Sequence, residues 1–148
     1  MIMTQNQKEL LLTDISARLR YGLKCTYYDK CVDEQDEGTI TGMQNGTYLV
    51  IDGVCIDVEN VKPYLLPFSS ITDDMMEELN VNGFFKYHDS IANVSHLESN
   101  NGISKEIYTC IDVESISFLM DLFHSHHIDY RGWIEMGLAE DATGKNIY

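Results

Sequence analysis

Hydrophobic and polar residues alternate along residues 37–58, EGTITGMQNGTYLVIDGVCIDV, and two turn signals interrupt the alternation. The dipeptides Asn45-Gly46 and Asp52-Gly53 supply the positive φ angles that a two-residue type I′ turn requires. The stretch therefore predicts a three-stranded antiparallel meander, and we expect the rest of the chain to be organised around it.

The two turns fix the register of this meander independently. The first pairs Gln44 with Thr47, Met43 with Tyr48, Gly42 with Leu49 and Ile40 with Ile51. The second pairs Ile51 with Val54 and Leu49 with Ile56. Directly opposed residues share one face of a sheet. Both turns assign apolar residues to the same face, namely Ile40, Leu49, Ile51, Val54, Ile56 and Val58. A slip of one residue would break this agreement.

The segments beside the meander complete a β-rich part of the chain. Residues 13–19 predict a short helix capped by Thr13 or Asp14, residues 23–28 alternate as a strand, and residues 29–37 predict an exposed charged connection. Pro63 and Pro67 lack an N–H, which argues against a helix or a central strand over residues 58–67 and leaves a 3₁₀ turn near residues 59–62. By analogy this arrangement fits a small SH3-like barrel, and a simple antiparallel sheet is the alternative.

Two helices are predicted in the second half of the chain. Thr72 is a favourable N-cap for a helix that starts with Asp73 and Asp74 and ends by residue 82, and Ile71 and Met76 could form a hydrophobic staple there. Residues 112–127 predict the main helix, capped by Asp112. Its apolar face is Val113, Ile116, Leu119, Met120 and Phe123.

Shorter elements surround these helices. Strands are expected over residues 84–88, 92–97 and 106–111. Asp129 could cap a last short helix over residues 130–136, which Gly137 would end. The tail over residues 138–148 is expected to be loose, except that Ile147 and Tyr148 could dock. Together these elements predict a single α+β domain over residues 1–148, with an N-terminal helix (1–20), a β subdomain (21–67) and a mixed α/β part (68–148).

Charge and composition restrict the possible partners. Lys plus Arg is 10 and Asp plus Glu is 24, so the net charge is −14. Such a surface disfavours direct contact with nucleic acid or anionic membranes, and it is compatible with a basic protein partner or with solvation alone. No apolar run could span a bilayer and no signal peptide is recognisable, so we expect a cytoplasmic protein.

The four cysteines show no metal-ligand spacing and are expected to be reduced. Cys25, Cys55 and Cys110 lie in apolar strand patterns, where a free thiol behaves as a small hydrophobe.

The segment from His124 to Asp129 contains three histidines and one carboxylate, which are the residue types of a zinc or iron site. On a helix, His124 and His126 would lie on opposite flanks, and only His124 and His127 could share a metal. No HExxH pattern supports this, so a partly buried His127 near the helix end is the preferred interpretation.

Other candidate groups stand without a supporting motif. His88 and His96 are isolated acid–base candidates, and the acidic run over residues 33–37 lacks the glycine and ligand spacing of a calcium loop. No GxSxG, P-loop or GxGxxG motif occurs. The sequence therefore assigns no catalytic residue, metal or cofactor. It leaves open whether the chain is an enzyme, and a non-enzymatic role is the preferred interpretation.

The segment Tyr130-Arg131-Gly132-Trp133 gathers residue types that are enriched at binding hot spots. With His127 it forms the predicted interaction patch, which consists of His127, Tyr130, Arg131 and Trp133. The alternative is that Tyr130 and Trp133 fasten the last segment to the core and that Arg131 pairs with an acid.

Three stretches resemble a group of small proteins of unknown function from bacteriophages and mobile elements of gut bacteria. These are ELLLTDISARLRYGLKC (residues 9–25), DVENVKPYLLPFSSIT (57–72) and HHIDYRGWIEMGLA (126–139). The family tends to have Pro at Arg20, Arg at Leu66, and a different tail after residue 139. The resemblance implies a mobile-element setting in a bacterial cytoplasm and implies no activity.

Three functions follow as hypotheses. The first is a non-enzymatic binding protein that contacts a host or phage protein. The second is an acidic decoy that mimics nucleic acid and occupies a DNA-binding protein. The third is a metal-dependent hydrolase that uses the region from His124 to Asp129.

Overall fold

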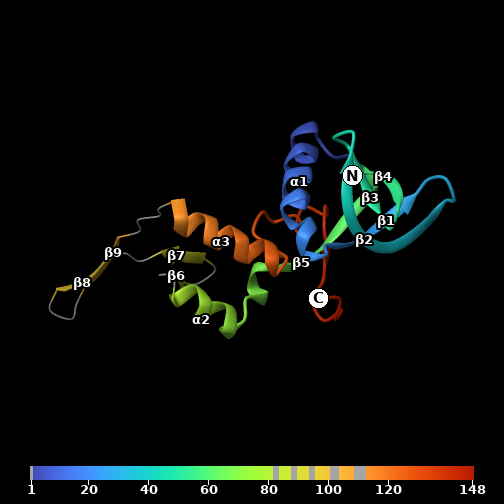
Figure 1. The fold of residues 1–148 in the computed structure, drawn as a ribbon. Coiled ribbons are helices and arrows are strands. Elements are labelled where there is room, and N and C mark those ends of the chain that lie inside the picture. Colours follow the sequence, from blue (N-terminus) through green and yellow to red (C-terminus); the bar gives the residue numbers. More distant parts are fainter. Residues whose placement is uncertain (1, 82–83, 88–89, 94–95, 101–103, 109–112) are drawn as a thin grey trace.

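The structure is a computed structural model that describes residues 2–81, 84–87, 90–93, 96–100, 104–108 and 113–148, with side chains described at 2–75, 77–78 and 117–148. Figure 1 shows a curled sheet beside helix α1 (Gln5–Arg18), with α2 (Asp73–Val81), α3 (Val113–Ser125) and two short hairpins on the other side of α1. Helices and a mostly antiparallel sheet confirm the α+β class.

The main sheet holds the predicted β subdomain. Its strands are β1 (Lys24–Asp29), β2 (Glu34–Gln44), β3 (Tyr48–Ile51), β4 (Val54–Asp57) and β5 (Val61–Pro67), with the short β10 (Ile128–Asp129) and β11 (Glu140–Asp141). Five strands follow the order β5-β1-β2-β3-β4, and β10 and β11 pair with β5 in parallel. β2 begins at Glu34, so the prediction of a connection over residues 29–37 is wrong. Only the turn between Asp29 and Glu34 connects β1 to β2.

The meander forms, and its register differs from the prediction at one turn. The pairs Ile51–Val54 and Leu49–Ile56 are confirmed, as is Ile40–Ile51. Nearer the first turn, Gln44 pairs with Tyr48 and Met43 with Leu49, one residue away from the predicted partners. The loop holds three residues rather than two, and an irregularity between Ile40 and Gly42 absorbs the extra residue.

This compensation preserves the predicted apolar face. The buried members of the face are Ile40, Leu49, Ile51, Ile56 and Val58, each at most 5% exposed. Val54 is the exception at 42% exposed, and it lies at the start of the edge strand β4, next to the second turn. Cys55 is also exposed, so the prediction that its thiol behaves as a buried hydrophobe is wrong, whereas Cys25 is buried.

β5 contradicts the argument from proline, since it pairs with strands on both sides. The predicted 3₁₀ turn does occur, at Val58–Asn60 (η2). Successive residues of a strand direct their N–H groups to opposite sides. The Tyr64 carbonyl faces the side of β1, where the Tyr148 hydroxyl bridges it to the Lys24 amide. Pro63 therefore directs its nitrogen away from β1, and its missing N–H removes no bond from that ladder.

Helix α1 starts eight residues before the predicted helix start at residue 13, so that prediction is wrong at its N-terminus. Its first turn carries a capping box, in which Thr4 Oγ1 accepts from the Gln7 amide and Gln7 Oε1 accepts from the Thr4 amide. The buried face of α1 contains Leu11, Leu12 and Ile15, and also the charged residues Asp14 and Arg18.

The second half matches the prediction in its helices and departs from it in its strands. Thr72 caps α2 as predicted, since its Oγ1 accepts from the Met75 amide. Two hairpins lie between the helices, β6 (Phe84–Tyr87) with β7 (Ser90–Asn93) and β8 (His96–Asn100) with β9 (Ser104–Tyr108). The predicted single strand over residues 92–97 is therefore wrong, because that stretch contributes to two strands. Cys110, the Asp112 cap, the predicted helix end at residues 82–83 and His88 lie outside the described residues.

The last segment folds differently from the prediction. After α3 the chain forms β10 and then one turn over residues 133–137, so the predicted helix over residues 130–136 is wrong. Gly132 lies inside the predicted helix and has positive φ, which a continuing helix does not allow, whereas the positive φ of Gly137 fits its predicted role as a stop. Nor is the tail loose, since Leu138, Ala139 and Ala142 are buried and Tyr148 stacks on His127. Within the described chain, no helix has the length and apolar character needed to cross a membrane.

Candidate functional site

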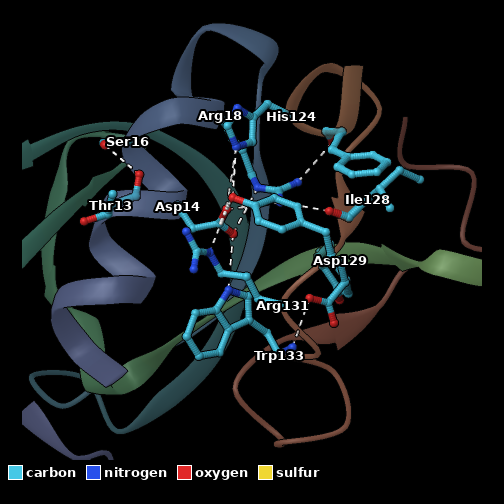
Figure 2. Close-up of polar contacts among 12 residues, drawn as sticks. Thr13, Asp14, Ser16, Arg18, His124, Ile128, Asp129, Arg131 and Trp133 are labelled. Carbon is cyan, nitrogen blue, oxygen red and sulfur yellow. Dashed lines mark hydrogen bonds and ion pairs between the residues drawn. The ribbon is translucent and has the colours of Figure 1, made fainter. Parts of the chain in front are cut away.

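Asp14 is the centre of a buried polar cluster between α1 and the segment that follows α3. The Asp14 cluster consists of Asp14, Arg18, His124, Tyr130, Arg131 and Trp133. Figure 2 shows the labelled side chains of Arg18, His124, Arg131 and Trp133 around the Asp14 carboxylate. Asp14 and Arg18 are one helical turn apart on α1 and are 2% and 1% exposed. Their position on the inward face of α1 explains why two opposite charges lie inside the protein.

The Asp14 carboxylate accepts hydrogen bonds from three side chains. Arg18 donates through Nε to Oδ2 at 3.1 Å and through Nη2 to Oδ1 at 3.2 Å. The Tyr130 hydroxyl donates to Oδ1 at 2.7 Å, and the Trp133 indole N–H donates to Oδ2 at 3.3 Å. This set satisfies both carboxylate oxygens, so the buried charge is fully paired.

Arg18 also ties the cluster to the backbone beyond α3. Its Nη2 donates to the Ile128 carbonyl at 2.8 Å, and its Nη1 lies 3.4 Å from the Phe123 carbonyl. Hydrogen bonds to the carbonyls at a helix end satisfy groups that the helix itself leaves without partners. Arg18 thus joins α1 to the C-terminal end of α3.

Aromatic contacts complete the cluster. The Tyr130 ring has the Arg18 guanidinium carbon 5.5 Å and the Arg131 guanidinium carbon 5.1 Å from its centroid, within the range of cation–π attraction. Phe123 stacks on Tyr130 at 5.6 Å. Burial, followed by the Asp14 charge, raises the pKa of Tyr130, so its hydroxyl remains a donor at neutral pH.

His124 is held in one tautomer by its neighbours. Its Nε2 lies 3.1 Å from the Tyr130 hydroxyl, whose proton already goes to Asp14, so Nε2 must carry a hydrogen and donate. Burial, followed by the Arg18 charge, lowers the pKa of His124. Nε2 therefore does not present a free metal-binding lone pair in this arrangement.

His127 lies just after α3, is buried, and adopts the left-handed conformation with φ of 54°. Its Nε2 donates to the Tyr21 carbonyl at 3.2 Å, and its Nδ1 is buried without a hydrogen-bond partner. Burial, followed by the Arg18 charge, lowers the pKa of His127 to about 4. The ring stacks on Tyr148 with centroids 3.9 Å apart, so His127 holds the tail.

The predicted interaction patch is mostly interior. His127 and Trp133 are each 2% exposed, while Tyr130 and Arg131 are partly buried. Arg131 Nε lies 3.9 Å from Asp14 Oδ1. These placements agree with the alternative given by the sequence, in which the aromatic residues fasten the last segment to the core and Arg131 pairs with an acid. Asp14, Arg18 and His124 complete the constellation, and the helical spacing of Asp14 and Arg18 was the available signal.

Asp129 organises the turn after β10 rather than a helix. Its Oδ1 accepts from the Trp133 amide at 2.9 Å and its Oδ2 from the Ile134 amide at 2.8 Å. Both oxygens are thus occupied by backbone donors. Within the described residues, no three His, Cys, Asp or Glu side chains are grouped so that they could hold a metal ion.

Away from the Asp14 cluster, the sheet has a solvent-accessible groove between β1 and β4. The β1–β4 groove has a volume of about 240 Å³ and is lined by Tyr28, Asp29, Lys30, Cys31, Tyr48, Cys55, Ile56, Asp57 and Asn60. A second groove of about 260 Å³ shares Tyr28 and Asn60 with it and continues toward Glu59 and Lys62. Tyr28 and Tyr48 are 39% and 41% exposed, and both Cys31 and Cys55 are exposed.

Comparisons with known protein families, with curated proteins and with solved structures find no match to this chain. The resemblance to mobile-element proteins and the SH3-like barrel therefore remain predictions. In the fold, two of the three stretches that carry the resemblance, residues 9–25 and 126–139, meet at the Asp14 cluster.

Proposed function

We propose that this chain is a non-enzymatic binding protein of a phage or mobile element, which acts in the bacterial cytoplasm through contact with another protein. The β1–β4 groove is its contact surface. One observation carries the proposal: two tyrosines and two thiols stand exposed around a groove, while Asp14 and Arg18 of the Asp14 cluster are buried and paired with each other.

Exposed tyrosines favour a binding role because they supply a large amphipathic contact area at a small entropic cost. Tyr28 and Tyr48 lie on two walls of the same groove, so one partner segment can contact both. The Asp14 cluster supports this surface indirectly, because it fixes α1 and the C-terminal segment against the same sheet.

The test is a capture experiment with three full-length baits in lysate of a bacterial host that carries the mobile element. The baits are the native chain, the groove variant Tyr28→Ser/Tyr48→Ser, and the control Met136→Ser, which removes a comparably exposed apolar side chain elsewhere. We expect the same partner with the native chain and with the control, and its loss with the groove variant. Equal capture by all three baits would reject the groove as the contact surface.

The acidic decoy is the second hypothesis within the same class. It requires a regular row of acidic groups, and the exposed Glu34 and Asp36, two residues apart on β2, provide a short one. A decoy would bind a DNA-binding protein with an affinity that falls steeply with salt and is unaffected by Tyr28→Ser/Tyr48→Ser. The salt dependence of capture by native and groove-variant baits therefore separates the two.

The metal-dependent hydrolase is the hypothesis from a different class. It needs His124, His127 and Asp129 as ligands, and each of these residues has other hydrogen-bond partners in the fold. Elemental analysis of protein purified without chelator decides this alternative. A stoichiometric transition metal that is lost in His124→Ala would favour the hydrolase over the binding protein.

A further inference from the structure

Among the described residues, the β4 edge and the end of β1 at Tyr28 have no neighbouring strand where they border the β1–β4 groove. β4 is the last strand in the sheet order, so one of its edges has no neighbour within the described chain. Across the groove, β5 begins at Val61, opposite Tyr27, so the following residue Tyr28 has no β5 partner. Both edges contribute residues to the lining of the groove.

The register shows which backbone groups point into the groove from β4. A two-residue turn makes Ile51 and Val54 a hydrogen-bonded pair, and inward and outward residues alternate from there. The hydrogen bond from the Val58 amide to the Thr47 carbonyl fits this alternation. Cys55 and Asp57 therefore direct their N–H and C=O groups outward, toward the groove.

The same alternation applies to β1. The Ile40 amide donates to the Leu23 carbonyl, so Leu23 and every second residue after it face β2. Lys24, Thr26 and Tyr28 then face the opposite side, where Lys24 and Thr26 meet Tyr148 and β5. Tyr28 is the next residue in this series, and its backbone groups face the groove.

Charge decides what kind of segment fits these edges. Asp29 and Asp57 line the groove with a single base, Lys30, and Asp33, Glu34 and Asp36 are exposed in the adjoining hairpin. In the described part of the chain neither Asp29 nor Asp57 forms an ion pair with a Lys or Arg. A second copy of this chain would place the same carboxylates and a net charge of −14 next to Asp29 and Asp57, and the like charges would repel each other.

From these observations we propose that the β1–β4 groove binds an extended basic segment of a partner protein, which adds as a strand to the free edge of β4. The outward N–H and C=O groups of Cys55 and Asp57 would form the ladder, Tyr28 and Tyr48 would contact alternate side chains, and Asp29 and Asp57 would pair with Arg or Lys. This inference rests on the proposed function and adds the conformation and charge of the partner.

The native cysteines report on occupancy of the groove. Cys31 and Cys55 line it and are exposed, whereas Cys25 is buried and serves as an internal reference. The probe is an acetylated peptide of alternating Arg and Val, titrated into the full-length protein at low ionic strength. Alkylation of each cysteine is followed by mass spectrometry, and amide chemical shifts are followed by NMR on ¹⁵N-labelled protein.

Three matched comparisons separate strand pairing from charge. A peptide of the same sequence with N-methyl groups on alternate residues keeps the charge but loses the N–H donors on one edge. Asp57→Lys reverses one charge in the groove, and Glu77→Lys makes the same change at an exposed position on α2. A Glu–Val peptide tests the sign of the charge.

We expect the Arg–Val peptide to protect Cys31 and Cys55 and to shift the amides of Cys55 and Asp57. Affinity should fall about tenfold with N-methylation and with Asp57→Lys, and it should stay unchanged with Glu77→Lys. Equal binding of the N-methylated peptide would overturn the strand pairing, as would a concentration-dependent dimer that blocks the groove. If no peptide binds while partner capture still depends on Tyr28 and Tyr48, this inference fails and the proposed function stands.

Discussion

Arg18 and Asp14 form a buried ion pair one helical turn apart, with Nε 3.1 Å from Oδ2 and Nη2 3.2 Å from Oδ1. Because both side chains are at most 2% exposed, removing either charge leaves the other in the interior without its counter-charge. We expect Asp14→Asn to lower the free energy of unfolding by about 3–5 kcal/mol, as measured by urea denaturation.

A surface pair in the same protein provides the control. Arg20 and Asp121 lie 3.5 Å apart with side chains that are 67% and 65% exposed, so Asp121→Asn should cost less than about 1 kcal/mol. The double variant Asp14→Leu/Arg18→Met removes both buried charges and should be more stable than Asp14→Asn. A cost for Asp14→Asn as small as that for Asp121→Asn would contradict the view that the Asp14 cluster fastens α1 to the C-terminal segment.

His127 predicts a pH dependence of stability. Burial, followed by the Arg18 charge, lowers its pKa in the folded protein from 6.5 to about 4. Between these two values the unfolded chain binds a proton that the folded protein does not, so stability rises with pH. The contribution is fully present above about pH 6.5 and is lost as the pH falls toward 4. Its maximum is about 3 kcal/mol.

The comparison variant is His127→Asn, because Asn tolerates the left-handed conformation that this position adopts. Carboxylates titrate in the same range, so the measured quantity is the difference in unfolding free energy between native protein and variant at each pH. The native protein should lose stability relative to His127→Asn between pH 6.5 and 4. Parallel pH profiles would show that the imidazole is accessible to protons in the folded state.

The sequence predicted the parts of the fold that depend on local patterns. The meander, the Thr72 cap and the apolar face of Ile40, Leu49 and Ile51 follow from turn chemistry and periodicity over a few residues. The three-residue loop after Gln44 was not predicted. The irregularity near Gly42 restores the apolar face, so the hydrophobic pattern of the sequence gives no sign of the one-residue shift in register. The start of α1 was predicted too late in the sequence, although Thr4 and Gln7 have the residue types and spacing of a capping box.

The wrong prediction at β5 and the Asp14 cluster, which the sequence did not reveal, have a different cause, because both depend on contacts between residues far apart in the sequence. Pro63 is accepted in a paired strand because its nitrogen faces away from β1, which no local pattern reveals. Likewise, Tyr130 and Trp133 are residue types that are common at binding surfaces. In the fold, however, both donate hydrogen bonds to Asp14, which lies more than a hundred residues earlier in the sequence. Residue types alone do not distinguish a binding patch from a buried anchor.

The Tyr148 hydroxyl bridges the backbones of β1 and β5. Its hydroxyl donates to the Tyr64 carbonyl at 2.7 Å and accepts from the Lys24 amide at 3.2 Å, while its ring stacks on His127. Tyr148→Phe removes only the hydroxyl and should cost about 1–2 kcal/mol of unfolding free energy. Tyr148→Ala also removes the stacking and should cost more. Equal stability of both variants and the native protein would mean that the tail is not docked in solution.

The described cysteines should differ in reactivity by position. Burial, followed by the charge of Asp52, raises the pKa of Cys25 to about 12, so its thiol is both covered and protonated. Cys31 and Cys55 are exposed. Because the thiolate is the reactive form, iodoacetamide at pH 8 should alkylate Cys31 and Cys55 and leave Cys25 unmodified until urea is added. Mass spectrometry of the digested protein resolves each site, and early modification of Cys25 would contradict the packing of β1 against the core.

At Gly38, the side chains of Ile51 and Asp52 lie so close to the backbone of β2 that a Cβ atom does not fit. A Cβ atom there would lie 2.5 Å from Ile51 Cγ2 and 2.5 Å from Asp52 Oδ2, and Ile51 is fully buried and cannot move freely. Gly38→Ala should therefore destabilise the protein by about 1–3 kcal/mol in urea denaturation.

Gly42→Ala, in the same strand, is the matched control, because its Cβ would be 3.9 Å from the nearest atoms of Val50. The control should be neutral or slightly stabilising, since alanine restricts the unfolded chain. Similar costs for the two variants would indicate a general intolerance of β2 to side chains rather than a close contact at the second turn of the meander.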